Sequence, residues 1–265
     1  TWYKDTYVME PVQKRGFDNN LWVWEHPNYN RNYMISADVA RGDGSDYSTF
    51  QVLDIEDSSQ VAEYRGKIDT KDFGNFLTGV ATEWNQALLV VENSNVGWAA
   101  IQAVIDRGYP NLFYMSNDLK YVDVERQMSN KYYRDEKQMV AGFSTTMKTR
   151  PLIISALDTY MGEKEIIIRS SRLIDELFTF IWNNGKAEAM KGYNDDLVMA
   201  LGIGLWVRNT ALRLTQEGLD LTKNMLNSAT VSQYQSVYTT THLKHNPYEM
   251  DLGGGDKENL HWLLG

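Results

Sequence analysis

Two adjacent carboxylates, Asp195 and Asp196, stand at the predicted start of a strongly apolar helix. Asn194 before them is a favourable N-cap residue, and acidic side chains in a first helical turn are stabilised by the helix dipole. Asp38 and Glu92 each end a predicted buried strand, where a lone carboxylate would be costly. We therefore expect the four acids to meet at one site.

Carboxylates that converge from two strand ends and a helix N-terminus suit hard divalent cations. Two such ions about 3.5–4 Å apart can stabilise both the attacking water and the leaving oxygen of phosphodiester hydrolysis. In that arrangement Asp38 is the central ligand, Glu92 the second, and Asp196 or Asp195 the third. The all-oxygen ligand set favours Mg²⁺ as the cofactor, and Mn²⁺ can replace it.

The helix after the acidic pair carries a stripe of small residues. Asp196, Ala200 and Gly204 recur every four positions and share one face, which could approach a sheet closely. We therefore predict that Asp196 points toward the strand ends and is the main metal ligand of the pair. Asp195 is then a second-metal or supporting ligand.

The composition is that of an ordinary globular protein, with 265 residues of which 43% are hydrophobic and 23% charged. The absence of cysteine excludes disulfides, thiolate metal sites and cysteine nucleophiles. The longest apolar run, residues 197–207, is shorter than the roughly 20 residues that cross a bilayer, so no membrane partner is expected. Because the net charge is −9, any nucleic-acid contact must rest on a local basic patch or on bound cations.

Hydrophobic patterning predicts an α/β fold with a mixed central sheet flanked by helices. Three strands joined by turns come first, then a helix, then a continuously apolar strand of the kind that parallel sheets cover on both faces. The strands are predicted at 33–39, 48–55, 59–68, 87–91, 111–115, 165–168 and 186–190, and the helices at 70–84, 97–107, 151–160, 171–182 and from the acidic pair to about 214. Acids at the first strand, the fourth strand and a late helix are the layout of the ribonuclease-H-like nuclease fold.

Five short motifs, all in one order, make this layout more specific. They are Ser36–Asp38 with Gly42 and the acidic turn Asp43–Asp46, Val90–Gly97, Gly142–Thr146, Glu176–Phe180 and Tyr193–Leu201. With them the chain resembles the C-terminal nuclease domain of the large terminase subunit of tailed bacteriophages, most of all the T4-type, over about residues 33–207. By position, the family's catalytic acids fall on Asp38, Glu92 and the Asp195–Asp196 pair.

The resemblance implies a two-metal endonuclease that cuts double-stranded concatemeric viral DNA at the start and end of packaging. It also implies an ATPase motor domain beside the nuclease, the portal and the small terminase subunit as partners, and the cytoplasm of the infected bacterial host as the location. The chain has no Gly-x-x-x-x-Gly-Lys-Ser/Thr phosphate loop and starts at Thr1, so we expect the ATPase domain upstream in a longer protein. We accordingly expect an irregular lead-in from that missing domain over 1–32, the nuclease domain over 33–215 and a peripheral tail over 216–265.

Basic side chains in two regions are candidates for phosphate contact. Lys148 and Arg150 precede a proline-started helix, where a solvated face is the other interpretation. Lys131 and Arg134 lie in a basic and aromatic excursion between residues 116 and 143, which an exposed loop would also resemble.

Other functions stay open at this point. A ribonuclease-H-like junction resolvase or RNA/DNA-hybrid nuclease would use the same fold and acids. In a non-catalytic DNA- or portal-docking module, the same acids would be present but would catalyse no reaction. Asp38 with the following turn also resembles the phosphate loop of actin-like ATPases, but the sequence shows neither a second such loop nor a nucleotide pocket. Asp43 and Asp46 in that turn are interpreted as ordinary turn residues, although either could reach a metal through water.

Overall fold

A six-stranded mixed sheet forms the centre of the fold, with the strand order β1-β2-β5-β4-β3-β6. The computed structural model describes residues 7–211 except 17, 45, 95, 117–138 and 184, together with 249–251 and 257–259. β3 pairs in parallel with β6, and every other neighbouring pair in this sheet is antiparallel. The strands are β1 (Gln13–Arg15), β2 (Leu21–Val23), β3 (Tyr33–Asp38), β4 (Ser48–Asp54), β5 (Gln60–Gly66) and β6 (Leu88–Val91).

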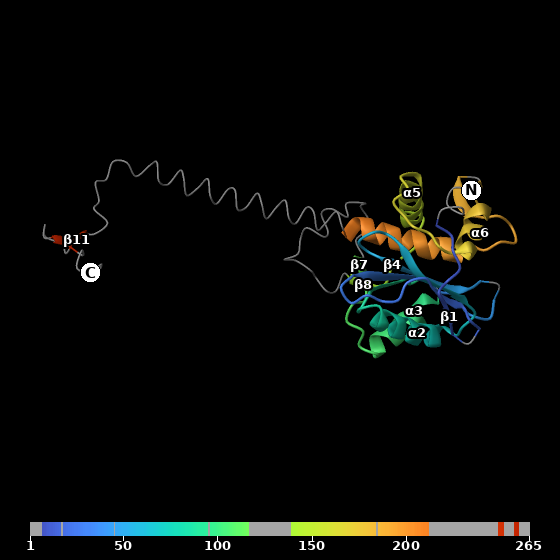
Figure 1. The fold of residues 1–265 in the computed structure, drawn as a ribbon, viewed down its shortest axis with the longest axis horizontal. Helices are drawn as coiled ribbons and strands as arrows, with labels where there is room; N and C mark the ends of the chain where they lie inside the picture. Colours follow the sequence, from blue (N-terminus) through green and yellow to red (C-terminus); the bar gives the residue numbers. More distant parts are fainter. Residues whose placement is uncertain are drawn as a thin grey trace. The chain divides into compact units, whose positions relative to one another are not determined.

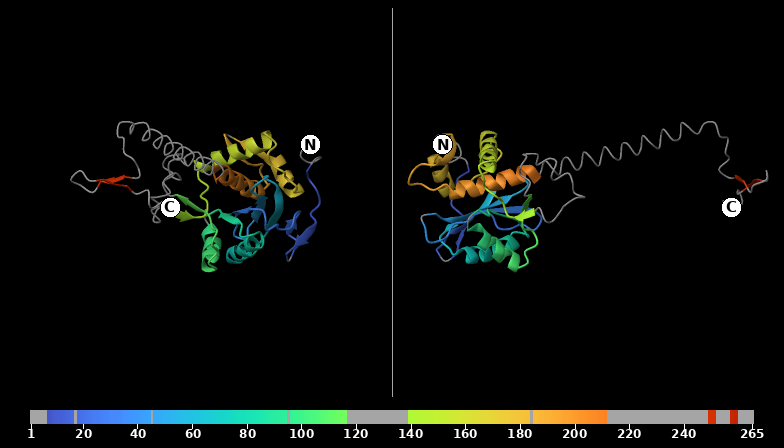
Figure 2. Two further views of the ribbon diagram at one scale, coloured as in Figure 1. Left: turned by 60° about the vertical axis from the view of Figure 1, so that its left-hand side comes forward. Right: turned by 180° about the vertical axis from the view of Figure 1, so that it is seen from behind.

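Helices cover both faces of this sheet (Figure 1). α2 (Thr70–Glu83) and α3 (Gly97–Asp106) lie on one face. α5 (Thr149–Gly162), α6 (Ser171–Thr179) and the helix over residues 196–211 lie on the other, as the turned views of Figure 2 also show. All seven residues of β4 are therefore buried. The predicted α/β fold, with a mixed sheet between helices, is confirmed.

Separate apolar clusters fill the two layers. On the α2 side, the rings of Phe50, Tyr64 and Phe73 pack together with centroids 5.3 to 6.2 Å apart. On the other side, Leu53 of β4 belongs to a cluster with Leu201 of the helix over 196–211. Burial of apolar surface in both layers supplies the main favourable contribution to folding.

The lead-in is more regular than predicted at residues 13–23. β1 pairs with β2, and β2 pairs with β5, so this segment extends the sheet at one edge. Strands of three residues are too short to show a period of two, which is why the hydrophobic pattern gave no sign of them.

Two predicted elements near α6 also differ from the structure. The predicted strand at 165–168 is reduced to a single bridge between Ser59 and Ile167. The predicted helix end at residue 182 is wrong, because α6 ends at Thr179 and β9 (Phe180–Asn183) forms a hairpin with β10 (Lys186–Ala189). The run Phe-Ile-Trp at the start of β9 consists of residue types that favour strands.

The predicted excursion between residues 116 and 143 lies largely outside the described residues, and with it Lys131 and Arg134. At its two ends, β7 (Tyr114–Ser116) pairs with β8 (Met139–Ala141). The predicted strand at 111–115 therefore begins later, although Leu112 still forms a bridge to Leu89 of β6.

The chain divides into two compact units, Thr1–Leu214 and Thr215–Gly265. In the second unit, β11 (Glu249–Asp251) pairs antiparallel with β12 (Lys257–Asn259). None of the helices in the described part of the chain is long and apolar enough to cross a membrane.

The helix over 196–211 approaches the sheet closely through its small residues. Ala200 is fully buried, and a Cβ added at Gly204 would lie 2.6 Å from Ser36 Oγ and 3.2 Å from Leu53 Cδ1. A side chain at position 204 would therefore push the helix away from β3 and β4. Since Asp196 stands at the start of this helix, the approach at Gly204 sets how near that carboxylate comes to the strand ends.

We expect Gly204→Ala to lower the free energy of unfolding by about 1–3 kcal/mol, because the added methyl group overpacks the contact with Ser36. Gly79 in α2 has no atom within 4 Å of an added Cβ and provides the matched control. Gly79→Ala should raise the free energy of unfolding by up to about 1 kcal/mol through helix propensity. Urea unfolding measures both, and equal stability of the two variants would contradict the close approach.

Candidate acidic site

The four predicted acids lie at one edge of the sheet. Asp38 ends β3, and Glu92 directly follows β6, the parallel neighbour of β3. Both acids therefore lie at the carboxyl ends of two adjacent parallel strands. Burial raises the pKa of Asp38 well above its ordinary range, and Glu92, Asp196 and Asp195 raise it further by their negative charge, Glu92 also by a hydrogen bond. The other three acids therefore all lie close enough to Asp38 for their charges to act on it.

Asp196 is held at this edge by the turn before β4. Its Oδ2 accepts hydrogen bonds from the backbone N–H of Tyr47 at 2.9 Å and from Nδ2 of Asn194 at 3.1 Å. Its carbonyl oxygen accepts a third, from Thr49 Oγ1 at 3.0 Å. Burial raises the pKa of Asp196, the two donors to Oδ2 oppose that shift, and the charges of Asp46 and Asp195 add to it. Asn194, predicted as an N-cap, thus orients the neighbouring carboxylate.

Asp195 forms an ion pair with an arginine instead. Arg150 Nη2 lies 2.9 Å from Asp195 Oδ2, and the same guanidinium donates from Nε and Nη2 to the carbonyl oxygen of Ala187 at 3.3 and 2.9 Å. Ala187 belongs to β10, so Arg150 joins the start of α5, the β9–β10 hairpin and the acidic pair. The sequence indicated a phosphate contact or a solvated position for Arg150, and it gave no sign of this ion pair.

The motif Gly142–Thr146 is a strap between the end of β6 and the start of α5. Phe143 exchanges backbone hydrogen bonds with Val91 and Asn93, each 2.8 Å long. Ser144 Oγ donates to Asn93 Oδ1 at 2.8 Å, and Thr149 Oγ1 donates to the Ser144 carbonyl at 2.8 Å. The strap therefore fixes the residue after Glu92 and the residue before Arg150 in one network.

Glycine is required at the beginning of this strap. Gly142 has φ +81°, and an added Cβ would lie 2.4 Å from the Val91 carbonyl oxygen. The backbone can pass this close to β6 only because no side chain is present.

Glu176 is a buried acid of α6 that contacts the start of the helix over 196–211, and the sequence indicated no chemical role for it. Its Oε2 accepts a hydrogen bond from the backbone N–H of Leu197 at 2.8 Å. Burial raises the pKa of Glu176 to about 8, against the opposing effects of Arg65, 3.6 Å away, and of the Leu197 N–H. One sequence signal marks it, because an acid three residues after Leu173 falls on the apolar face of α6.

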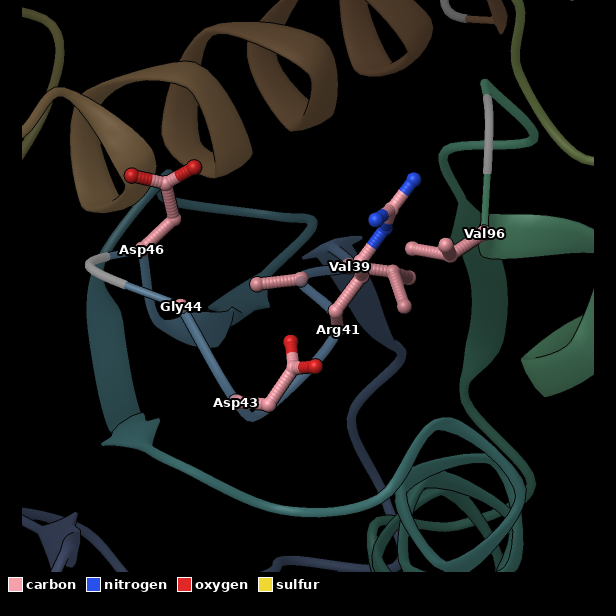
Figure 3. A pocket seen from close by; sticks show the side chains of 7 residues that line it. Val39, Arg41, Asp43, Gly44, Asp46 and Val96 are labelled. Carbon is pink, nitrogen blue, oxygen red and sulfur yellow. The ribbon is translucent and has the colours of Figure 1, made fainter.

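A pocket of about 390 Å³ opens beside the acids (Figure 3). It is lined by Val39, Ala40, Arg41, Asp43, Gly44, Asp46 and Val96. Figure 3 shows the Asp46 carboxylate pointing toward the nearby helix, consistent with its electrostatic effect on Asp196. Asp46 is therefore more than the ordinary turn residue that the sequence suggested.

Several basic side chains lie near the site. Lys148 is exposed. Arg65 and Lys67, which the sequence analysis did not single out, lie over the ring of Tyr47 at 4.3 and 5.4 Å from its centroid. Since the Tyr47 backbone binds Asp196, these two cations stand next to the acidic edge.

The chemistry of the acidic edge suits a hard cation. Its donors are carboxylate oxygens, and among the described residues only Asp195 of the four acids has a basic ion-pair partner. In their present positions, no three or more His, Cys, Asp or Glu side chains of the described residues form a group that could hold a metal ion. The acidic side chains would therefore have to rearrange before they could hold one ion together.

The buried Glu176 leads to a prediction about pH and stability. An acid with a folded-state pKa of about 8 and an unfolded value near 4.5 contributes stability that is fully present below pH 4.5 and is lost as the pH rises through 8. Glu176→Gln keeps an oxygen for the Leu197 N–H but does not titrate. We expect the stability of this variant relative to wild type to rise by about 2–4 kcal/mol between pH 5 and 8.5 in urea unfolding. Glu165→Gln, at an exposed position, is the control and should show no such rise.

No protein-family model matches the sequence. Among solved structures, the large terminase nuclease from thermophilic phage G20c, with bound cobalt and with bound magnesium, aligns at TM-score 0.56 and 19% identity over 76% of this chain and 93% of that chain. The large terminase nuclease domain of Thermus phage P74-26 aligns at TM-score 0.53 and 20% identity over 75% and 90%. The resemblance predicted from the motifs is confirmed at the level of the fold. The chain has the ribonuclease-H-like fold of phage large terminase nucleases.

Proposed function

We propose that this chain is a metal-dependent endonuclease that cuts double-stranded concatemeric viral DNA during genome packaging. The observation that carries the proposal is the placement of Asp38 at the end of β3, Glu92 directly after the parallel strand β6, and the Asp195–Asp196 pair close enough to act on Asp38 by charge, all on a ribonuclease-H-like sheet. The structural neighbours support it, because they are phage large terminase nucleases and were solved with cobalt, magnesium or zinc bound.

The ligands of the proposed cation site are Asp38, Glu92 and Asp196, with Asp195 in a supporting position. A divalent cation would offset the negative charge that raises the pKa of Asp38. Mg²⁺ is the expected ion and Mn²⁺ a substitute, because both prefer oxygen ligands. When bound, the ion would activate a water molecule and neutralise charge at the scissile phosphate.

The protein's own groups would orient the ligands and keep them in place. The Tyr47 N–H and the Asn194 amide fix the direction of the Asp196 carboxylate, and Thr49 anchors its backbone. Positioning of this kind matters because a displacement of about 1 Å can cost about 100-fold in rate.

Duplex DNA would approach this edge along basic side chains. Lys148 is exposed, and Arg65 and Lys67 stand over Tyr47 beside the acids. These cations would contact phosphates, as would Arg150 if it leaves Asp195. Lys131 and Arg134 stay candidates from the sequence alone. An upstream ATPase domain, the portal and the small terminase subunit are the proposed partners, in the host cytoplasm.

We expect Asp38→Asn and Asp196→Asn each to reduce cleavage of a supercoiled plasmid by about 100-fold or more in Mg²⁺ or Mn²⁺, because each removes a charged ligand at nearly constant shape. Asp158→Asn, an exposed position on α5, is the matched control and should cut like wild type. Chelation of the metal should stop cleavage. Unchanged cutting by both site variants would overturn the assigned site.

The substrate class is tested with the same protein. Linear duplex, a four-way junction and an RNA/DNA hybrid of equal length are compared under one metal concentration. Preference for duplex supports the packaging nuclease, whereas preference for the junction or the hybrid would assign the site to a resolvase or a hybrid nuclease.

A further inference from the structure

The ion pair between Arg150 and Asp195 lies inside the acidic site rather than on its outer surface. The two side chains are 23% and 27% exposed, so both are mostly shielded from solvent. The guanidinium also donates two hydrogen bonds to the Ala187 carbonyl, at 2.9 and 3.3 Å. Two separate partners therefore fix its plane and its position, unlike a typical mobile surface arginine.

The backbone that carries Arg150 is equally well fixed. Thr149 is 1% exposed, and its hydroxyl donates to the Ser144 carbonyl and accepts from the Thr146 N–H at 2.7 Å. Ala187 is 5% exposed on β10. The guanidinium thus extends from a buried part of the backbone to a buried residue of β10, and these two contacts hold it beside Asp195.

The position of this charge matters because of its neighbours. Among the described residues, no arginine or lysine forms an ion pair with Asp38, Glu92 or Asp196, so Arg150 is the one cation paired with the acidic set there. Asp195 also contributes to the negative charge that acts on Asp38. A metal cation at these acids would compete with the Arg150 guanidinium for the Asp195 carboxylate. The two positive charges would also repel each other.

We propose that Arg150 is a positioning residue that holds Asp195 as an ion pair and that a divalent cation must displace or share this pair to bind at the acidic site. The proposal rests on the proposed function, since it concerns the same site, and it adds a built-in competitor for the cation. Arg150 then lowers the affinity for the ion because it occupies the Asp195 carboxylate.

Competition and a purely structural role predict different changes in cation affinity when Arg150 is replaced. If Arg150 competes with the cation, its removal relieves repulsion and frees Asp195, so the cation binds more tightly. If Arg150 only supports the local structure, its removal leaves Asp195 poorly placed, so binding weakens or stays the same.

The experiment is calorimetric titration of Mn²⁺ into the full 265-residue chain, without DNA. Arg150→Gln should bind Mn²⁺ about three- to tenfold more tightly than wild type, a change of the size of one partly exposed ion pair. Lys191→Gln removes the same charge at an exposed position four residues before Asp195 and should stay within about twofold of wild type. Equal or weaker binding by Arg150→Gln than by Lys191→Gln overturns the proposal.

Two further variants exclude a general charge effect and a folding defect. In an Asp195→Asn background, Arg150→Gln should no longer change Mn²⁺ affinity, because the shared carboxylate is absent; a persistent gain overturns the proposal. Arg150→Lys keeps the positive charge and should bind Mn²⁺ more weakly than Arg150→Gln, and equal affinities would count against competition. Thermal unfolding checks that each variant is folded.

The proposed function can fail separately from this inference. If Asp38→Asn binds Mn²⁺ as tightly as wild type does, both the cation site and this role of Arg150 are overturned. Binding that Asp38→Asn abolishes but Arg150→Gln leaves unchanged would preserve the site and overturn only the competition.

Discussion

The acidic pair lies near the end of β3 because the backbone of the helix over 196–211 packs closely against side chains of β3 and β4. At Gly204 there is no room even for a methyl group beside Ser36. Nearer the helix start, Thr49 Oγ1 binds the Asp196 carbonyl and the Tyr47 N–H binds its carboxylate. The helix is therefore fixed along its length, by close packing at one end and by hydrogen bonds at the other. The acidic edge depends on both.

A buried polar network under this helix start gives the contact its direction. Glu176 of α6 accepts the Leu197 N–H, and the fully buried Glu63 of β5 accepts hydrogen bonds from Ser170 and Arg172 at 2.8 and 2.9 Å. Apolar packing alone has little directional preference, whereas buried donors and acceptors must meet in one geometry or lose their hydrogen bonds. The network thus sets the angle at which the helix meets the sheet, at the cost of burying several charges.

The same fold brings together charges that repel one another. Burial and three neighbouring carboxylates raise the pKa of Asp38, and burial raises the pKa of Asp196. Strain of this electrostatic kind is typical of sites that bind cations or transfer protons. Arg150 relieves it only at Asp195, where the β9–β10 hairpin and the start of α5 hold the guanidinium. The hairpin and the acidic pair are thereby linked through one side chain.

The sequence by itself determined the types and order of the main elements, because apolar periodicity and continuous apolar runs record which faces are buried. It also singled out Asp38, Glu92, Asp195 and Asp196 as candidate site residues, since acids at the ends of buried elements stand out against their surroundings. These features are local in the chain, and local patterns are what a sequence records directly.

Only the tertiary structure decided which side chains face each other. Arg150 and Asp195 are 45 residues apart, and Glu176 lies 21 residues from Leu197, so no spacing in the sequence joins them. The short strands β1 and β2 are likewise stabilised by pairing with β5 rather than by their own pattern. Ion pairs, buried hydrogen bonds and edge strands depend on partners that folding brings close, and for that reason they could be found only once the fold was known.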